Sequence, residues 1–361
     1  MVEPTLRDEA GHCYSYAQSL LGEAKKQSLG VELWAGKGGE SLFKGERVHG
    51  FFSQRYRKLQ QIYLFYKLIG QDANIFVPIT SSFELKVLVH LLRISKKYRG
   101  KIFLHFHQYK RKSKKLHFLS ELAKKHPEFY IMASTDRLAE IFISAGFKNV
   151  QAVAYPVYGK ELGYKHDTQK VPNLVYVGAA REDKGFVQVV DFIEFMVEKK
   201  IDFKFIIQCS KPHGGKYDKV VLEAVEKLKA LQSKTKNIEI LEYTLTSGQY
   251  WGLFKDAICF AVYDKSKYAD SVSGVLLDAM SAHVPIVTTL DTWMADIILE
   301  HRAGEVVNSR DESNLMKAVQ AILSDYGTYV KHAGRASESL RQFHSPEPTI
   351  KYIKHSLEDG L

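Results

Sequence analysis

The sequence predicts an α/β protein made of two Rossmann-like, doubly wound lobes, and three observations support this fold class. The chain has 361 residues, more than the roughly 100–200 residues of one ordinary domain. Short β-rich runs alternate with amphipathic stretches, as in chains that build parallel sheets from βαβ units. A polar stretch with Gly and Pro at residues 159–173 interrupts the alternation, so we expect the lobes to join near residue 165.

The first lobe is expected to comprise residues 1–163. Its opening, "MVEPTL", is typical of the end of a strand followed by a loop. The later β-rich runs are "VELWAG", "ANIFVPI", "KIFLHFH", "FYIMAS" and "VQAVAYPV". Amphipathic stretches such as "YSYAQSLLGEAKKQSLG" and "SSFELKVLVHLLRISKKY" separate these runs and predict helices.

The second lobe is expected to comprise residues 164–340. Its predicted strands are "LVYVG", "DFKFIIQCS", "IEILEY", "AICFAVY" and "PIVTT", with helices between them. The tail "SPEPTIKYIKHSLEDGL" has Pro punctuation and then a helical pattern. We therefore expect residues 341–361 to form a C-terminal helix that leaves the second lobe and packs back on the first.

Composition indicates a globular protein outside the membrane, since 45% of residues are apolar and 25% are charged. No apolar run reaches the ~18–20 residues needed to span a bilayer, and the N-terminus has no signal-peptide pattern. Cys13, Cys209 and Cys259 lie far apart, which indicates reduced core thiols rather than a metal site. We expect a cytoplasmic protein, with peripheral association at the inner face of a membrane as a further hypothesis.

The net charge of +10 is concentrated in the first half of the chain. Residues 1–160 carry 26 Lys/Arg against 13 Asp/Glu, whereas residues 161–361 carry 25 against 28. Between residues 51 and 115 the ratio is 15 to 2, with aromatic residues interleaved, as in "QRYRKLQQIYLFYKL". This segment is either a solvated face or a surface that meets phosphates of lipid or nucleic acid.

In doubly wound sheets ligands bind beyond the carboxyl ends of strands, so the loops after strands are the first places to search. In "VYVGAAREDKGF" an apolar strand runs into Gly178, a turn follows, and Lys184 and Gly185 precede the next helix. Such a turn offers backbone amides, a helix N-terminus and a cation, which suit a diphosphate. A solvated turn is the alternative interpretation.

A second candidate is "YADSVSGVLLDAMSAHVPIVTT", where we expect "DKSKYADSVS" to be a polar loop and "GVLLDAMSA" a helix. Ser271 or Ser273 can cap this helix, and the amides near Gly274 can receive an anion. Asp270 precedes the helix and Asp278 lies about one turn inside it, so the pair spans ~12 Å or less. That separation fits the two ends of a nucleotide sugar, and the alternative is one loop aspartate and one surface aspartate.

Two loops of the first lobe are the remaining candidates for ligand binding. "KIFLHFHQY" places His105 and His107 at the end of a strand, where His107 follows the last apolar residue and is expected to face the cleft between the lobes. "EAGHCYSYAQ" places Gly11 and His12 just before the first helix. A histidine in an apolar strand is more often a core residue than a catalytic one, so both interpretations of the pair stay open.

The two second-lobe motifs resemble those of glycosyltransferases with two Rossmann lobes, the GT-B fold, and among them the retaining family 4 (group 1) enzymes. That family has a "G-R-L-x-x-x-K-G" turn, which aligns with "GAAREDKG" at Gly178, Lys184 and Gly185. Its "E-x7-E" element aligns with Asp270 and Asp278, followed by "AM" as in the family. The resemblance covers most of the second lobe and implies a GT-B fold with an interlobe cleft.

The resemblance also implies roles for single residues. Lys184 is expected to bind the donor diphosphate, Asp278 the ribose hydroxyls and Asp270 the donor sugar. His107 is expected to lie near the transferred sugar, and backbone around Leu245 to receive the nucleobase. The sequence departs from the family in two respects: both glutamates are aspartates, and Ala179 replaces the turn arginine, for which Arg181 is a possible substitute.

These expectations add up to a metal-independent glycosyltransferase of hexosyltransferase type that acts in polysaccharide biosynthesis. The donor is a UDP- or GDP-linked sugar bound as substrate, with no cofactor, and transfer proceeds with retention. The basic first lobe suggests a glycan or lipid-linked acceptor and contact with an anionic membrane surface. Two alternatives are a nucleotide-sugar epimerase, which needs no acceptor, and a non-catalytic nucleic-acid-binding protein, which would explain the basic segment but not the acidic motif.

Overall fold

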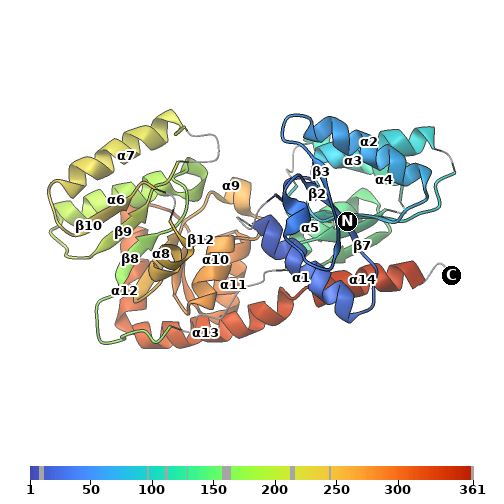
Figure 1. Ribbon diagram of the computed structural model, residues 1–361. Helices are drawn as coiled ribbons and strands as arrows, with labels where there is room; N and C mark the ends of the chain where they lie inside the picture. Colours follow the sequence, from blue (N-terminus) through green and yellow to red (C-terminus); the bar gives the residue numbers. More distant parts are fainter. Residues whose placement is uncertain are drawn as a thin grey trace. The chain divides into compact units, whose positions relative to one another are not determined.

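The computed structural model describes residues 1–7, 12–95, 97–109, 113–127, 129–156, 164–211, 216–243 and 245–358. Contacts divide the chain into two compact units. One comprises Met1–Tyr158 and Phe343–Leu361, and the other comprises Gly159–Gln342. Each unit contains parallel β-structure covered by helices (Figure 1).

The first unit has its strands in the order β3-β2-β1 and β4-β5-β6-β7, and β1 contacts β4. All paired neighbours are parallel. The strands are β1 (Val2–Glu3), β2 (Glu32–Gly36), β3 (Arg47–Phe52), β4 (Ile75–Val77), β5 (Ile102–Phe106), β6 (Tyr130–Ala133) and β7 (Asn149–Ala152). The predicted strand runs did not include β3, an edge strand whose residues are largely exposed or half-buried.

Helices cover both faces of this β-structure. Side chains alternate along β4 and β5, so Phe76 and Phe103 pack with α1 and α14, whereas Val77 and Leu104 pack with the helices opposite. The helices that pack on Phe76 and Phe103 are α1 (His12–Lys26) and α14 (Glu347–Glu358), and they contact each other (Figure 1). The opposite helices are α2 (Arg57–Gly70), α3 (Ser82–Ile94), α4 (Ser113–Lys125) and α5 (Asp136–Ala145), and a 3-10 turn spans Gly39–Ser41.

The second unit is a six-stranded sheet in the order β10-β9-β8-β11-β12-β13. Every neighbouring pair is parallel. The strands are β8 (Asn173–Tyr176), β9 (Phe205–Gln208), β10 (Ile238–Leu241), β11 (Ala257–Ala261), β12 (Ile286–Thr289) and β13 (Gly304–Val307). The first strand in sequence thus lies in the middle of the sheet, beside the fourth.

Apolar faces of helices bury both sides of this sheet. Helices α6 (Phe186–Glu198), α7 (Lys219–Gln232) and α12 (Glu312–Ser324) share one core with β8, β9 and β11. Helix α10 (Gly274–Ser281) contacts β11, and α11 (Trp293–His301) contacts β12 and β13. The remaining elements are α8 (Ser247–Gly252), α9 (Lys265–Tyr268), α13 (Tyr326–Phe343) and a 3-10 turn at Glu182–Lys184.

Candidate active site

The strand order of the second unit places two predicted motifs at the same edge of the sheet. The chain winds from β8 to β9 and β10 in one direction and then continues from β11 on the other side of β8. A ligand crevice forms beyond the carboxyl ends of the strands at such a switch point. The Asp264 amide after β11 donates a hydrogen bond to the Asp183 carbonyl after β8, at 2.9 Å, so these loops are in contact.

Lys184 and Gly185 lie directly against the loop that follows β11. Gly185 has φ 74°, and a Cβ added to it would lie 2.3 Å from the Val262 carbonyl oxygen. The Lys184 ammonium is 5.4 Å from the centre of the Tyr263 ring. Among the described residues no carboxylate pairs with this ammonium. Burial, and next the Arg181 charge, lower the pKa of Lys184, so an arriving phosphate would relieve an electrostatic cost.

Arg181 has a different environment from Lys184. Its Nε and Nη2 donate hydrogen bonds to the two Asp183 carboxylate oxygens, at 2.9 and 2.5 Å. Two of its five N–H groups therefore already bind an anion. Arg181, the predicted substitute for the missing turn arginine, is therefore a weaker candidate than Lys184 for binding the donor diphosphate.

Gly178 forms the first bend after β8, with φ 111°. Its N–H donates to Oε1 of Gln208, the last residue of β9, at 2.7 Å. This amide is thus bound by a buried side chain from the neighbouring strand. Gln208 was not among the residues predicted from the sequence, although a polar residue that ends an apolar strand is a detectable signal.

The acidic motif surrounds the start of α10. Ser273, one of the two predicted caps, accepts a hydrogen bond from the Leu276 amide at 3.4 Å. A Cβ added to exposed Gly274 would meet no atom within 4 Å, so space is open beside the first amides of the helix. Asp270 is buried just before the helix.

The expectation of a polar loop before this motif was wrong in part. Lys265–Tyr268 form the short helix α9. The Asp264 side chain caps it by accepting a hydrogen bond from the Ser266 amide at 2.9 Å. A local Asp cap therefore overrides the polar composition that suggested a loop.

Asp278 lies one turn inside α10 and is only partly accessible. Its Oδ2 accepts a hydrogen bond from the Tyr250 hydroxyl of α8, at 2.5 Å. Burial raises the pKa of Asp278 to about 6, although the hydrogen bond from Tyr250 opposes this shift. Burial and the neighbouring carboxylate raise the pKa of Tyr250, so its hydroxyl stays protonated and donates.

Leu245 lies one residue before Thr246, the residue that caps α8. Within the described part of the chain, the Leu245 N–H and carbonyl have no hydrogen-bond partner. Because α8 also carries Tyr250, the backbone at Leu245 lies just before the helix that holds the partner of Asp278.

The histidines of the first unit form a connected network. The neutral His105 donates from Nε2 to the Val153 carbonyl at 3.0 Å and accepts at Nδ1 from the Tyr16 hydroxyl at 2.5 Å. Burial, and next the nearby His107, keep the pKa of His105 well below its usual value. His105 is therefore a satisfied core residue, the alternative that sequence analysis left open.

His107 has protein partners at both ring nitrogens. Nε2 donates to the Pro78 carbonyl at 2.7 Å, and Nδ1 is 2.7 Å from the Ser134 hydroxyl. These bonds orient the ring at the carboxyl end of β5. Its role beside a transferred sugar stays a prediction. Gly11 lies outside the described residues.

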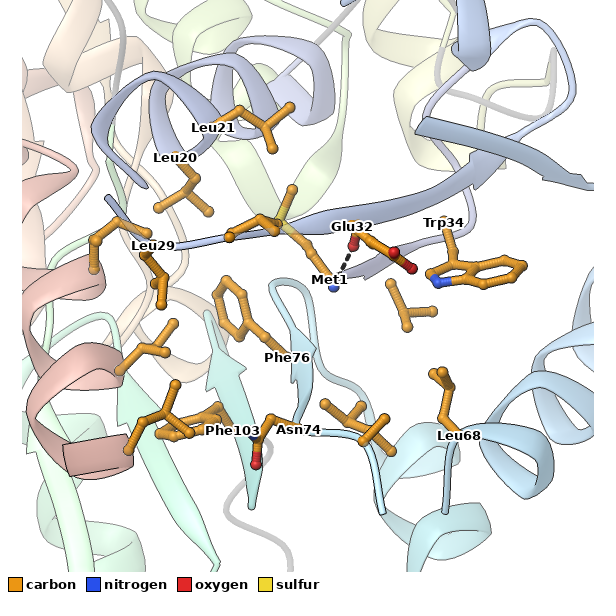
Figure 2. A pocket seen from close by; sticks show the side chains of 18 residues that line it. Met1, Leu20, Leu21, Leu29, Glu32, Trp34, Leu68, Asn74, Phe76 and Phe103 are labelled. Atoms are coloured by element: carbon orange, nitrogen blue, oxygen red, sulfur yellow. Dashed lines mark hydrogen bonds between the residues drawn. The ribbon is translucent and has the colours of Figure 1, made fainter. Parts of the chain in front are cut away.

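The first unit contains a cavity of about 250 Å³. Figure 2 shows that its lining side chains are mainly apolar. The lining includes Met1, Val31 and Asn74, which directly precede β1, β2 and β4. The cavity thus lies at the amino ends of the strands, whereas ligands of open parallel sheets bind at the carboxyl ends. We therefore do not assign it to the candidate active site.

The contact at Gly185 gives a testable prediction. Gly185→Ala should lower the free energy of unfolding by about 2–4 kcal/mol, because the new methyl strains a left-handed residue and overlaps the Val262 carbonyl. Gly248→Ala is the matched control, since its Cβ meets nothing within 4 Å and a helical alanine adds about 0.5–1 kcal/mol. Urea unfolding of both variants checks this, and equal stabilities would contradict it.

Within the described residues, no helix has the length and apolar character required to cross a membrane. In the same part of the chain, no group of three or more His, Cys, Asp or Glu side chains could hold a metal ion.

The second unit matches a known protein family over most of its length. Residues 171–325 match the family model of "Glycosyl transferases group 1". A comparison with curated proteins gives no match. Over 99–100% of its length the chain is also similar to solved structures.

The α,α-trehalose 6-phosphate synthase from Burkholderia multivorans is 12% identical, with 100% of this chain and 99% of that chain covered and a TM-score of 0.68. A glycosyltransferase from Rickettsia africae ESF-5 is 13% identical, with 99% and 96% covered and a TM-score of 0.68. Anabaena Alr3699/HepE, in complex with UDP and glucose, is 14% identical, with 99% and 98% covered and a TM-score of 0.66. At these identities the likeness establishes the fold, and the predicted pair of Rossmann-like lobes of the GT-B type is confirmed.

Proposed function

We propose, because residues 171–325 match the family model of the group 1 glycosyltransferases, that the protein moves a hexosyl unit from a nucleotide sugar to a hydroxyl group of a glycan or lipid-linked acceptor. The donor we favour is UDP-linked, because the similar Anabaena protein was solved with UDP and glucose. Transfer is proposed to retain the anomeric configuration and to need no metal.

The observation that carries this proposal is the grouping of a cation, open helix amides and a carboxylate in the second unit. Lys184 follows β8, Gly274 begins α10, and Asp278 lies one turn further on. A diphosphate needs the first two groups and ribose hydroxyls need the third. Lys184 and the amides of α10 would stabilise the negative charge that develops as the diphosphate departs.

In the proposed reaction the bond between the anomeric carbon and the diphosphate oxygen breaks, and the oxygen of the acceptor hydroxyl bonds to that carbon from the same face. The hydroxyl proton passes to the departing diphosphate oxygen. Asp278 holds the ribose and the backbone at Leu245 receives the base, so the donor is fixed at one end while its sugar reacts. Asp270 and His107 are proposed to contact the sugar. Orientation of this kind reduces the entropy lost on reaching the transition state.

A charge placed at Gly274 tests this assignment. Gly274→Glu should leave stability unchanged or slightly raised, because its Cβ has open space and an acid in the first helical turn is favourable. The same carboxylate would repel the donor diphosphate. The parent protein should gain about 2.7 kcal/mol from a sugar nucleotide at ~100 times its dissociation constant, and the variant should gain little.

The measurement is thermal unfolding with UDP, GDP, ADP and CMP sugars. Stabilisation of the parent by one nucleotide class, lost in Gly274→Glu, would identify the donor. No stabilisation of the parent by any class, or equal stabilisation of both proteins, would refute the proposed donor site.

A further inference from the structure

Helix α2 of the first unit exposes an apolar stripe that its own core does not use. Leu59, Tyr63 and Tyr66 are 67%, 60% and 62% exposed. With the exposed Ile62 they follow the i, i+3, i+4, i+7 spacing of one helix face. The opposite face of the same helix is buried and includes Leu64, Phe65 and Ile69. The helix therefore has a second apolar face directed to solvent.

Cations flank this stripe and no acid lies within α2. Lys58 and Lys67 belong to the helix and Arg55 precedes it, with its guanidinium 5.5 Å from the exposed Tyr56 ring. Lys67 approaches the Trp34 ring at 5.7 Å. Over residues 51–115 the sequence has 15 Lys/Arg against 2 Asp/Glu. The apolar stripe thus lies in the most basic part of the chain.

We propose that the outer face of α2 is a docking surface for anionic lipid membranes, with Leu59, Ile62, Tyr63 and Tyr66 entering the interface between headgroups and acyl chains. Helices with an apolar stripe and flanking Lys/Arg bind in this way, and tyrosine favours that depth because its ring is apolar and its hydroxyl is polar. The inference rests on the proposed function in one respect: a lipid-linked acceptor would lie at this surface.

The chemistry of the stripe favours lipid over the other occupants. Single-stranded nucleic acid binds through aromatic rings that stack on bases. Tyr63 and Tyr66 offer such rings, but the aliphatic Leu59 and Ile62, the other half of the stripe, do not. A second copy of the chain would bring two basic faces together, and like charges oppose that contact. Anionic headgroups match the flanking cations, and acyl chains match the stripe.

The test is co-sedimentation with vesicles of phosphatidylcholine, alone or with about 30 mol % phosphatidylglycerol, at low and at high salt. The variants are Leu59→Ser/Tyr63→Ser/Tyr66→Ser, which removes the stripe, and Arg55→Gln/Lys58→Gln, which removes flanking charge. Val220→Ser/Leu222→Ser on α7 is the matched control, since these residues are also exposed and apolar. Donor-induced thermal stabilisation is measured on every protein.

The parent should bind the anionic vesicles, and the stripe variant should bind them at least tenfold more weakly. Each removed cation should weaken binding about fivefold, and more at low salt than at high salt. The α7 control should bind like the parent, and all proteins should keep the donor response.

The proposal is overturned if the parent does not prefer anionic vesicles or if the stripe variant binds like the parent. It is also overturned if the stripe is needed for binding a single-stranded oligonucleotide and not for binding vesicles. Membrane binding without any donor response would refute the proposed function and leave the docking surface standing.

Discussion

Lys184→Ala should lower the rate of glycosyl transfer about 10²–10³-fold, the usual loss when one preorganised group that stabilises developing charge is removed. The ammonium lies at the switch point between β8 and β11, near Tyr263 and without a carboxylate partner in the described part of the chain. Burial lowers the pKa of this ammonium, and because burial also excludes water, its interaction with a phosphate is less screened than that of a surface lysine.

The loss should fall more on kcat than on KM. Negative charge on the diphosphate grows as its bond to the sugar breaks, so Lys184 stabilises the transition state more than the bound donor. Lys184→Arg should recover part of the activity because it keeps the charge but changes its geometry. Steady-state kinetics with the donor identified by thermal unfolding provide the measurement.

Lys265→Ala is the matched control. Lys265 is an exposed lysine of α9 that pairs with Asp291 at 2.9 Å, and a surface pair of this kind contributes little. Its removal should leave kcat within about twofold. Equal kinetics for Lys184→Ala and the parent would show that the cation after β8 does not act on the leaving group.

The local parts of the site could be predicted from the sequence. A glycine after an apolar strand, a Lys-Gly pair and a serine before a helix each have a local physical meaning, and Gly178, Gly185 and Ser273 adopt the corresponding bends and cap. The parallel strand order then brings the loops after β8 and β11 together without further information.

The partners of these residues could not be predicted, because they come from distant segments. Tyr250 bonds to Asp278, Gln208 bonds to Gly178, and Tyr16 bonds to His105 across 89 positions. Each pair depends on how the loops and helices pack, which no local pattern encodes. The short strand β13 was missed for a related reason, since four residues at a sheet edge carry little periodicity.

Asp278→Asn should have opposite effects on stability and on donor binding. Burial raises the pKa of Asp278 from 3.8 to about 6, so the ionised carboxylate destabilises the unliganded fold at neutral pH. A shift of this size corresponds to about 2–3 kcal/mol. The neutral amide should remove most of that cost. It should also weaken sugar-nucleotide binding about 10- to 100-fold, because ribose hydroxyls lose a charged acceptor.

The pH dependence of stability distinguishes removal of the buried Asp278 charge from a general effect on packing. Since the folded-state pKa is the higher one, the folded parent holds more protons than the unfolded chain between about pH 4 and 6, and its stability falls as pH rises through that window. The gain in stability of Asp278→Asn over the parent should therefore be full near pH 7.5 and should disappear near pH 4. A constant difference between the two proteins at all pH values would contradict the assignment.

Tyr250→Phe should act on the same carboxylate in a different way. The hydrogen bond from Tyr250 lowers the pKa of Asp278, so its removal should move the pKa further up. Donor binding by the parent should weaken as pH falls through about 6, when Asp278 gains its proton, and the phenylalanine variant should lose binding at a higher pH. Calorimetric titration of the donor between pH 5 and 8 measures both midpoints. Because the carboxylate is still present, Tyr250→Phe should regain affinity at alkaline pH, whereas Asp278→Asn should stay weak at every pH.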